Sequence, residues 1–408
     1  MYDREPREQV RLSRARPLPE NVGCDYFNRM LYKQPRILMT MLECGFGHKN
    51  PAIAVADAIE DNFPGAYHVD IVDFAKESGA RSSDELLKKS WDFSLAFPPP
   101  SRIGYLLVEL AGDRKEYIDV LLKEFVVKGM AYIRDYAPDL IFSTHPLCTY
   151  IAVKARETLG LTFKLTTYVV DPFDGYSWWA EEGSDYTLVA SERSKERLLK
   201  HGIPLRKIKV LGFPINKKFL RIESTPTAVL ENLGLDPRRK TILVSAGGQG
   251  IGKVFMYVEA LALLHLPINV ITVAGKNADT KRRMDRIVKM SSKTRIVSLG
   301  YVSNMNELAS ASDAIVGKAG ASTAMESIFL NKPMIFTEWA TYNDRYIINF
   351  ILDYKIGMYC PTVFSFLREM RAVAEGDRLR RCAENLAELN MKPGTDDVAR
   401  FLAEQLEP

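Results

Sequence analysis

The sequence contains few cysteines, no long apolar run and no excess of either charge. Its five cysteines are scattered without the spacing of a metal site and are typical of reduced thiols in a cytoplasmic protein. No run of about twenty apolar residues is present to span a membrane, and the amino terminus lacks an apolar signal core. The 55 basic and 51 acidic residues nearly balance, so the overall charge does not indicate nucleic-acid binding. We therefore expect a cytoplasmic protein.

Strand-like and helix-like segments alternate along two halves of the chain. With 408 residues, 47% of them hydrophobic, the chain can bury two substantial cores. Short apolar runs separated by helical patterns are typical of parallel, doubly wound sheets. A polar stretch from Phe213 to Arg239 separates the halves and is the best candidate for a hinge. The predicted fold class is α/β, with two Rossmann-like domains that face each other across a cleft.

The predicted boundaries follow this alternation. Residues 1–35 form a basic amino-terminal arm, of which residues 1–20 suit a disordered tail. Residues 36–215 form a first domain, residues 216–390 form a second domain, and residues 391–408 form a carboxy-terminal helix that could cross back to the first. The two halves share an architecture, and the sequence shows no short-period internal repeat.

A glycine-rich turn, Gly45-Phe46-Gly47-His48, follows the first apolar run and precedes a helical pattern that begins near Pro51. Glycines allow the backbone to approach a ligand closely, and a helix start offers free N–H groups and a positive dipole end to an anion or a developing charge. His48 is then expected at the mouth of the sheet. Capping of the helix by this side chain is an equally weighted alternative.

Two further turns in the second half suit a phosphate or diphosphate. One is Lys318-Ala319-Gly320-Ala321-Ser322-Thr323, which lies between a strand-like run and a helix start. The other contains Gly247 and Gly248 and follows the run Thr241–Val244, although it lacks the spacing of a dinucleotide fingerprint. Each turn alone is an ordinary helix cap more often than a ligand site. Their occurrence together favours a phosphate-binding half.

An insertion over about residues 80–130 interrupts the first domain. Its aromatic and aliphatic residues, Trp91 among them, are flanked by Lys88, Lys89 and Arg102, and this arrangement suits a surface that meets anionic lipid headgroups. The alternative is a helix pair packed over the sheet with its aromatic residues in the core. We favour that alternative slightly, because the amphipathic pattern of the stretch is not clean.

Short motifs occur along the chain in an order that can be compared with known families. They are Gly45-Phe46-Gly47-His48-Lys49, Thr144-His145-Pro146, Val169-Val170-Asp171, Ser191-Glu192, Gly212-Phe213-Pro214, Gly247-Gly248 and Lys318-Ala319-Gly320. Over about residues 36–405, their order and spacing resemble those of the two-domain GT-B glycosyltransferases. The resemblance is to the group of monogalactosyldiacylglycerol synthases, bacterial diacylglycerol glucosyltransferases and the N-acetylglucosaminyltransferase that makes lipid II.

The resemblance implies that the second domain binds a UDP-sugar. The glycine turn with Gly247 and Gly248, and Lys318 with the helix start from Gly320 to Thr323, would receive the diphosphate, so neither a metal nor another cofactor is expected. Glu326 lies one turn into the same helix. It resembles the carboxylate that receives the ribose hydroxyls, and the alternative is an ordinary exposed helical glutamate.

The chain departs from the family pattern where the donor sugar binds. The family's Pro-Gly-Gln-Glu-Lys-Gly-Asn is replaced here by Thr341–Asn349. Asn349 is the clearest counterpart, and Asn343 and Asp344 are stand-ins for the Gln-Glu pair. The identity of the sugar therefore does not follow from the sequence.

The resemblance also implies residues on the acceptor side. His48 is the expected base, because a neutral imidazole near pH 7 is poised to accept a proton. Asp171 is the rival base or the group that orients an imidazole, and an exposed aspartate is the weaker base unless burial raises its pKa. His145 either caps a helix or contacts the acceptor. Trp178 and Trp179 lie where the family has a tryptophan near its acceptor and anionic-lipid region, although buried aromatics are commoner.

The expected function is therefore that of an inverting glycosyltransferase, peripheral on the cytoplasmic face of a membrane. It would transfer a hexose from a UDP-sugar to a lipid hydroxyl, with diacylglycerol as the acceptor. Two other classes stay open. A UDP-N-acetylglucosamine 2-epimerase has the same two-lobed build, although its first-lobe carboxylate set is not convincingly present, and a catalytically silent UDP-sugar sensor needs only the second half.

Overall fold

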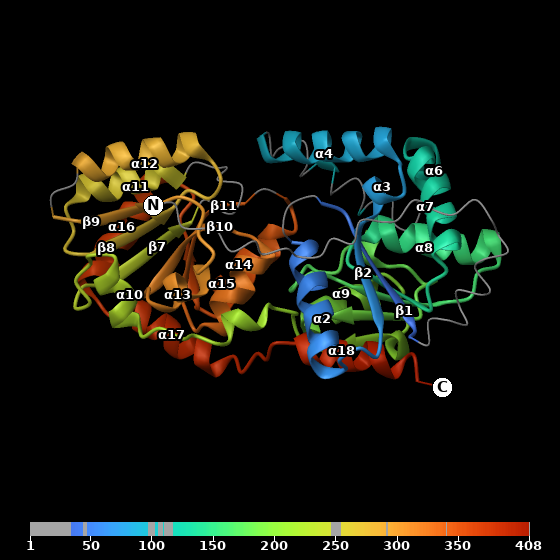
Figure 1. Ribbon diagram of the computed structural model, residues 1–408. Helices are drawn as coiled ribbons and strands as arrows, with labels where there is room; N and C mark the ends of the chain where they lie inside the picture. The colour runs from blue at the N-terminus through green and yellow to red at the C-terminus, as the bar shows by residue number, and fades with distance from the viewer. Residues whose placement is uncertain are drawn as a thin grey trace, which may run out of the picture.

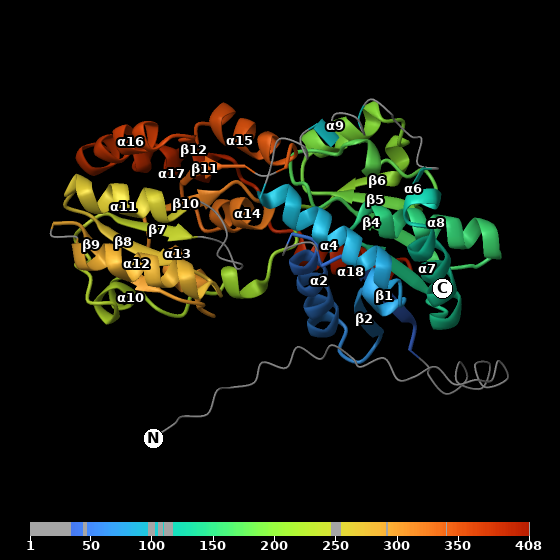
Figure 2. The ribbon, with the colours of Figure 1, turned by 90° about the horizontal axis from the view of Figure 1, so that it is seen from above.

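A computed structural model describes residues 34–43, 47–96, 103–104, 109, 117–245, 254–290, 293–339 and 341–407. These residues form two α/β lobes that lie side by side (Figures 1 and 2). The predictions for Gly45, Phe46, Arg102, Gly247 and Gly248, and for nearly all of the amino-terminal arm, fall outside the described residues.

The first lobe is built on a six-stranded parallel sheet of order β2-β1-β3-β4-β5-β6. Its central strands are short, almost fully buried apolar runs, because helices cover both faces. The strands are β1 (Arg36–Met41), β2 (His68–Asp73), β3 (Leu140–Ser143), β4 (Lys164–Tyr168), β5 (Tyr186–Val189) and β6 (Ile208–Val210). The helices are α2 (Lys49–Asn62), α3 (Phe74–Glu77), α4 (Arg81–Ala96), α6 (Tyr117–Leu121), α7 (Lys123–Tyr136), α8 (Pro146–Leu159), η1 (Ser177–Trp179), α9 (Glu192–Lys200) and η2 (Leu205–Lys207).

The second lobe repeats the architecture with a six-stranded parallel sheet of order β12-β11-β10-β7-β8-β9. Its strands are β7 (Thr241–Ser245), β8 (Asn269–Val273), β9 (Arg295–Leu299), β10 (Ala314–Lys318), β11 (Met334–Glu338) and β12 (Gly357–Tyr359). The helices are η3 (Lys217–Phe219), α10 (Pro226–Asn232), α11 (Val254–Leu264), α12 (Ala278–Met290), α13 (Met305–Ser310), α14 (Ala321–Phe329), α15 (Asp344–Asp353), α16 (Val363–Glu375) and α17 (Arg378–Glu388), and a last helix, α18 (Thr395–Glu404), follows the second lobe in the chain. The predicted α/β fold class with two Rossmann-like lobes is confirmed.

The strand order places one topological switch point in each sheet. In the first sheet the order reverses between β1 and β3, and in the second it reverses between β7 and β10. Ligands of doubly wound sheets bind outside the carboxyl ends of the strands at such points. The loop before α2 follows β1 and the turn before α14 follows β10, so both begin at a switch point. The two predicted turns therefore lie where ligands bind in folds of this kind.

The core is continuous between the lobes. One buried cluster contains Trp179 and Phe173 of the first lobe together with Met325, Phe336 and Phe350 of the second. The rings of Phe173 and Phe350 stack with their centroids 3.7 Å apart and their planes 7° from parallel. Contact between the lobes is therefore apolar and well packed at this point, in addition to the polar contacts described below.

The chain crosses between the lobes twice at nearly the same place. The outgoing segment and the returning segment pair through a parallel bridge between Phe213 and Pro393. The Thr395 hydroxyl donates to the carbonyl of Ile215 at 2.8 Å and accepts from its N–H at 2.9 Å. After the crossing, α18 packs against α2 of the first lobe. The carboxy-terminal helix thus lies on the first lobe, as Figure 1 also shows.

We expect Gly394→Ala to destabilise this crossing. A β-carbon at Gly394 would lie 2.2 Å from the carbonyl oxygen of Leu211 and 2.5 Å from backbone atoms of Gly212, and neither backbone can move without displacing the other. Such overpacking costs about 1–3 kcal/mol, so chemical denaturation should show a lower free energy of unfolding. Gly300→Ala is the matched control, since its β-carbon meets nothing within 4 Å. Equal stability of the two variants would contradict this account.

Candidate functional site

His48 lies at the start of α2, at the carboxyl edge of the first sheet. Its Nδ1 lies 2.5 Å from the carbonyl oxygen of Thr144, and the Thr144 hydroxyl donates to the His48 carbonyl at 2.9 Å. The side chain makes no capping hydrogen bond to α2. The capping alternative is therefore wrong for His48, and the imidazole is instead fixed between two loops of the sheet edge.

The Thr144 contact determines which nitrogen of His48 can accept a proton. A carbonyl oxygen only accepts, so Nδ1 carries the hydrogen and the neutral ring keeps its lone pair on Nε2. Burial lowers the pKa of His48 to about 4, although the hydrogen bond to Thr144 opposes this shift. The ring is therefore neutral near pH 7, and its affinity for a proton is low.

His145 caps α8, one of the two roles weighed for it. Its Nδ1 accepts a hydrogen bond from the backbone N–H of Leu147 at 3.2 Å. Its ring centroid lies 4.6 Å from that of His48. Burial, and then the neighbouring His48, lower the pKa of His145 well below its usual value. The two rings therefore form a neutral pair beside the switch point, and His145 helps to enclose His48.

Asp171 is the other ionisable group of this edge. Its Oδ2 accepts from the indole N–H of Trp179 at 2.7 Å and from the side-chain amide of Asn343 at 3.1 Å. The Trp179 ring centroid lies 6.2 Å from that of His48, so indole, imidazole and carboxyl form one cluster. Burial, and then the charge of Asp174, raise the pKa of Asp171 to about 7, while the hydrogen bonds from Trp179 and Asn343 act in the opposite direction.

The loop that contains Asp171 is fixed by a buried ion pair that the sequence did not reveal. Asp174 is 1% exposed and accepts from the guanidinium of Arg197 at 2.9 Å. The same guanidinium donates to Glu109 at 2.8 Å and lies over the ring of Tyr346 in the second lobe. Arg197 was missed because it lies on a charged helix and resembles a solvated surface residue there. Its partners are distant in the sequence.

The start of α14 provides groups suited to an anion. Gly320 is the N-cap residue, and no side chain caps the helix. The Oγ of Ser322 is buried and has no hydrogen-bond partner among the residues that the structure describes. Ala321, Ser322 and Thr323 form the first turn, and Lys318 ends β10 just before it. This N-terminus, with its free N–H groups and an unpaired hydroxyl, can receive a phosphate.

Glu326 is half-buried one turn further along α14. Burial raises its pKa to about 8, and the charge of Lys218 only partly opposes the shift. The alternative of an ordinary exposed helical glutamate is therefore wrong. A desolvated carboxyl group close to an anion-binding helix start can accept or donate hydrogen bonds to hydroxyl groups of a ligand.

The segment Thr341–Asn349 divides into residues inside and outside this cluster. Asn343 reaches Asp171, as described above. The carboxylate of Asp344 accepts from the backbone N–H of Thr341 at 3.0 Å and so closes the turn before α15. Asn349 is exposed on α15. The structure therefore places Asn343, and not Asn349, beside the other candidate residues.

The residues predicted for the acceptor and membrane side do not form one surface. Trp179 is 1% exposed within the cluster, whereas the indole N–H of Trp178 donates to the Tyr117 hydroxyl at 2.8 Å, in the packing of α6 and α8. The ammonium of Lys88 forms ion pairs with Asp73 and Asp84 at 3.1 and 2.8 Å. The charge of Lys88 is thus compensated within the lobe.

Two other residues of α4 differ in their surroundings. Lys89 is 78% exposed and pairs with Glu85 on the same helix at 3.3 Å. The indole nitrogen of Trp91 is buried and has no hydrogen-bond partner among the described residues. Gly47 lies directly before His48, and a β-carbon there would meet nothing within 4 Å.

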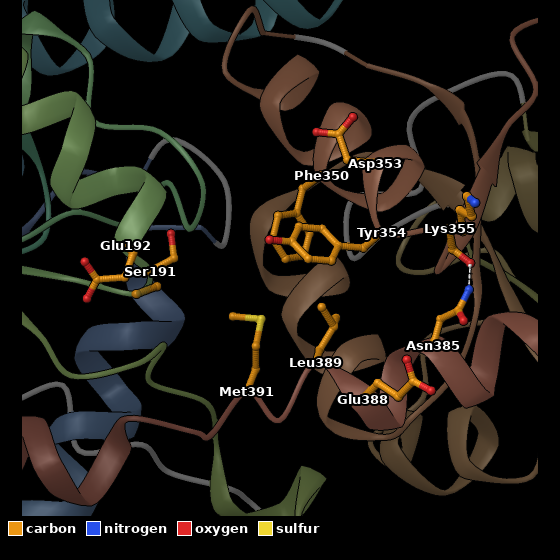
Figure 3. Close-up of a pocket in the computed structure, with 11 residues that line it drawn as sticks. Ser191, Glu192, Phe350, Asp353, Tyr354, Lys355, Asn385, Glu388, Leu389 and Met391 are labelled. Atoms are coloured by element: carbon orange, nitrogen blue, oxygen red, sulfur yellow. Dashed lines mark hydrogen bonds between the residues drawn. The ribbon is translucent and has the colours of Figure 1, made fainter.

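One cavity between the described residues lies away from this cluster. It has a volume of about 620 Å³ and opens between the start of α9 and the helices α15 and α17 (Figure 3). Its lining residues include Glu192, Phe350, Tyr354, Asn385 and Glu388, and none of the predicted site residues. Phe350, which lines it, also stacks on Phe173. We therefore build the site on the polar cluster and not on this cavity.

Neither a metal centre nor a membrane span is found in the described ranges. No group of three or more His, Cys, Asp or Glu side chains there could coordinate a metal ion. No described helix is both long and apolar enough to cross a bilayer.

Comparisons with known proteins assign a family to each lobe. The monogalactosyldiacylglycerol (MGDG) synthase family matches residues 48–215, and the glycosyltransferase family 28 C-terminal domain matches residues 241–346. The monogalactosyldiacylglycerol synthase of Spinacia oleracea is 24% identical over 336 residues, which are 79% of this chain and 63% of that protein. The chain therefore spans less than two thirds of that relative's length.

Solved structures agree on the architecture. Acinetobacter baumannii MurG superposes with a TM-score of 0.61 at 13% identity, over 91% of this chain and 99% of that one. The UDP-GlcNAc 2-epimerase of Neisseria meningitidis gives a TM-score of 0.54 at 12% identity, over 91% and 99%. Such low identities show the GT-B fold alone. The chain thus matches a glycosyltransferase family in each lobe, in the order that the sequence motifs indicated: the monogalactosyldiacylglycerol synthases in the first lobe and glycosyltransferase family 28 in the second.

Proposed function

We propose that this protein is an inverting glycosyltransferase that transfers a hexose from a UDP-sugar to a lipid hydroxyl, with diacylglycerol as the acceptor. One observation carries the proposal: Asp171, which shares a cluster with His48 in the first lobe, accepts a hydrogen bond from Asn343 of the second lobe. The glycosyltransferase family matches of the two lobes support sugar transfer, and the name of the spinach relative supports a diacylglycerol acceptor.

The donor is expected on the second lobe. The N–H groups at the start of α14, the Ser322 hydroxyl and Lys318 would bind the diphosphate, and Glu326 would bind the ribose hydroxyls. As the bond from the anomeric carbon to the diphosphate breaks, its electron pair passes to the departing phosphate oxygen. The helix start stabilises that developing charge, so we propose transfer without a metal.

The acceptor proton is proposed to pass to the His48–Asp171 pair as the lipid oxygen attacks the anomeric carbon. The geometry gives His48 an available lone pair on Nε2, and the pKa of about 7 gives Asp171 the greater affinity for a proton near neutrality. A base works best when its pKa lies near the operating pH. The desolvated carboxylate is therefore required in its ionised form, either to take the proton or to stabilise an imidazolium on His48.

The membrane side is proposed to lie on α4. This helix runs along the outer edge of the first lobe toward the second (Figures 1 and 2). Leu86, Lys89 and Phe93 share one of its faces by their spacing, and the two apolar side chains are each 54% exposed. Exposed apolar groups with a cation beside them suit an anionic interface. We place this face on the cytoplasmic surface of a membrane.

Purified protein incubated with several UDP-sugars, with and without diacylglycerol in anionic vesicles, tests the function. The proposal expects a glycolipid to form only when both substrates are present. Formation of an epimerised UDP-sugar without lipid would favour the epimerase alternative, whose fold neighbour is noted above. Binding of UDP without any product would favour a silent sensor.

Variants of the proton-accepting pair should differ in their pH profiles. We expect His48→Ala and Asp171→Asn each to lower kcat by roughly a hundred-fold or more, with UDP affinity unchanged. In the native protein kcat should fall as the pH drops through about 7, because Asp171 then becomes protonated. His48→Ala should retain this dependence and Asp171→Asn should lose it. A profile that disappears instead in His48→Ala would assign the titration to the imidazole.

The ribose contact can be tested with matched ligands. We expect Glu326→Ala to weaken UDP binding by roughly two- to tenfold, since a hydrogen bond between neutral groups contributes about 0.5–1.5 kcal/mol and Glu326 is mostly protonated near pH 7. UDP that lacks both ribose hydroxyls should bind the native protein and the variant with equal affinity, as measured by titration calorimetry. A variant that loses the same factor for both ligands would show that Glu326 does not contact the ribose.

Lipid binding should depend on the exposed face of α4. Lys89→Gln combined with Phe93→Ser should reduce co-sedimentation with phosphatidylglycerol vesicles at low salt, because a cation and an exposed ring are both removed. Phe364→Ser is the control, since Phe364 is 77% exposed on α16 of the other lobe. Unchanged co-sedimentation of the double variant would place the membrane contact elsewhere. Lys88 is avoided because its loss would leave the buried Asp73 unpaired.

A further inference from the structure

We propose that Asn343 is a positioning residue through which contact between the lobes orients Asp171 and favours its ionised form. The inference rests on the proposed function, in which Asp171 is required as a carboxylate. It differs from the donor-sugar role that the resemblance implied for this segment. The two residues are 172 positions apart and belong to different lobes, so only the assembled cleft brings them together.

The local structure frees the Asn343 amide for this contact. Asn343 is the N-cap residue of α15, a position where an asparagine side chain ordinarily accepts from the helix's own N–H groups. Here it makes no such bond. The carboxylate of Asp344 closes the turn instead, by accepting from the N–H of Thr341. The amide of Asn343 is therefore turned across the cleft, where its Nδ2 donates to Asp171.

The two donors to Asp171 select one oxygen for chemistry. Trp179 and Asn343 both donate to Oδ2, at 2.7 and 3.1 Å. Oδ1 has no hydrogen-bond partner among the described residues and is the oxygen available to an acceptor hydroxyl. Trp179 belongs to the same lobe as Asp171, so its hydrogen bond does not depend on how the two lobes are placed. Asn343 is the donor that depends on lobe contact.

The charges around Asp171 explain why the hydrogen bond from the Asn343 amide is important for its ionised form. The carboxylates of Asp174, in the same loop, and of Asp344, on α15, both disfavour a negative charge on Asp171. The nearby Tyr176 is uncharged, because burial raises the pKa of its hydroxyl well above the usual value. The nearby imidazole of His48 is neutral at pH 7. Arg197 is directed to Asp174 and Glu109. In the described part of the chain, no lysine or arginine forms an ion pair with Asp171. Neutral N–H donors are therefore its main stabilisers.

A consequence for the reaction follows from this arrangement. A hydrogen bond to the ionised form of a carboxyl group lowers its pKa. Without the Asn343 amide, Asp171 keeps Asp174 and Trp179 beside it but loses one donor to its ionised form, so it binds a proton more readily. Contact between the lobes through Asn343 therefore favours the reactive carboxylate. The acceptor is thus activated only when the donor lobe is in place.

The pH profile of kcat in the full-length protein tests this role. We expect Asn343→Ala to move the acidic limb upward by about one pH unit, because a hydrogen bond to a charged group corresponds to about one unit of pKa. The rate should then be about tenfold lower at acidic pH and equal to that of the native protein at high pH. Asn343→Asp should move the limb further, since it brings a third carboxylate to Asp171. Leu352→Ala, an exposed position on the same helix, is the control and should leave the profile unchanged.

A second measurement separates this inference from the proposed function. In protein labelled with ¹³C at the aspartate carboxyl groups, the signal of Asp171, identified by its loss in Asp171→Asn, should titrate at higher pH in Asn343→Ala. An unchanged titration would overturn the role of Asn343 whether or not the protein transfers sugar. A rate reduced equally at all pH values, or a change confined to the KM for the UDP-sugar, would make Asn343 a donor-binding residue instead. A native protein without transferase activity would contradict only the proposed function.

Discussion

The paired crossings between the lobes are the constraint on which the rest of the structure depends. The backbones at Gly212 and Gly394 are so close that neither position has room for a side chain, and Gly212 also has a φ of 82°. Two neighbouring segments joined by backbone and side-chain hydrogen bonds restrict the relative movement of the lobes more than one linker would. The lobes so connected bring the loop after β4 to the segment before α15, where Asp171 accepts a hydrogen bond from Asn343.

Burial determines the charge of the candidate site residues His48, Asp171 and Glu326. It lowers the pKa of His48 to about 4 and raises those of Asp171 and Glu326 to about 7 and about 8. All three shifts have the same cause, because removal from water disfavours the charged form of each group. These three side chains therefore carry much less charge than their residue types suggest.

The fold was predictable from the sequence because strands, turns and helix starts depend on local patterns. The alternation of apolar runs and helices gave both lobes, and the glycine turns marked the ligand edges of both sheets. Side-chain partners were less accessible. Lys88 lies in a sequence context typical of a lipid-facing cation, yet its charge is neutralised by Asp73 at the end of β2. Asn349 matched the family spacing but is exposed, whereas Asn343 reaches the other lobe. Such contacts depend on helix phase and lobe packing, which local sequence does not determine.

The low charge of these side chains has a consequence for the proposed reaction. A diphosphate at α14 would meet backbone N–H groups, the Ser322 hydroxyl and Lys318, and a mostly protonated Glu326 would repel it little near pH 7. Once bound, its negative charge raises the pKa of every nearby group. For His48 this opposes the desolvation that weakens it as a proton acceptor. The same charge would also raise the pKa of Asp171, which the proposed reaction requires as a carboxylate, so the hydrogen bonds from Trp179 and Asn343 that favour its ionised form matter most once the donor is bound.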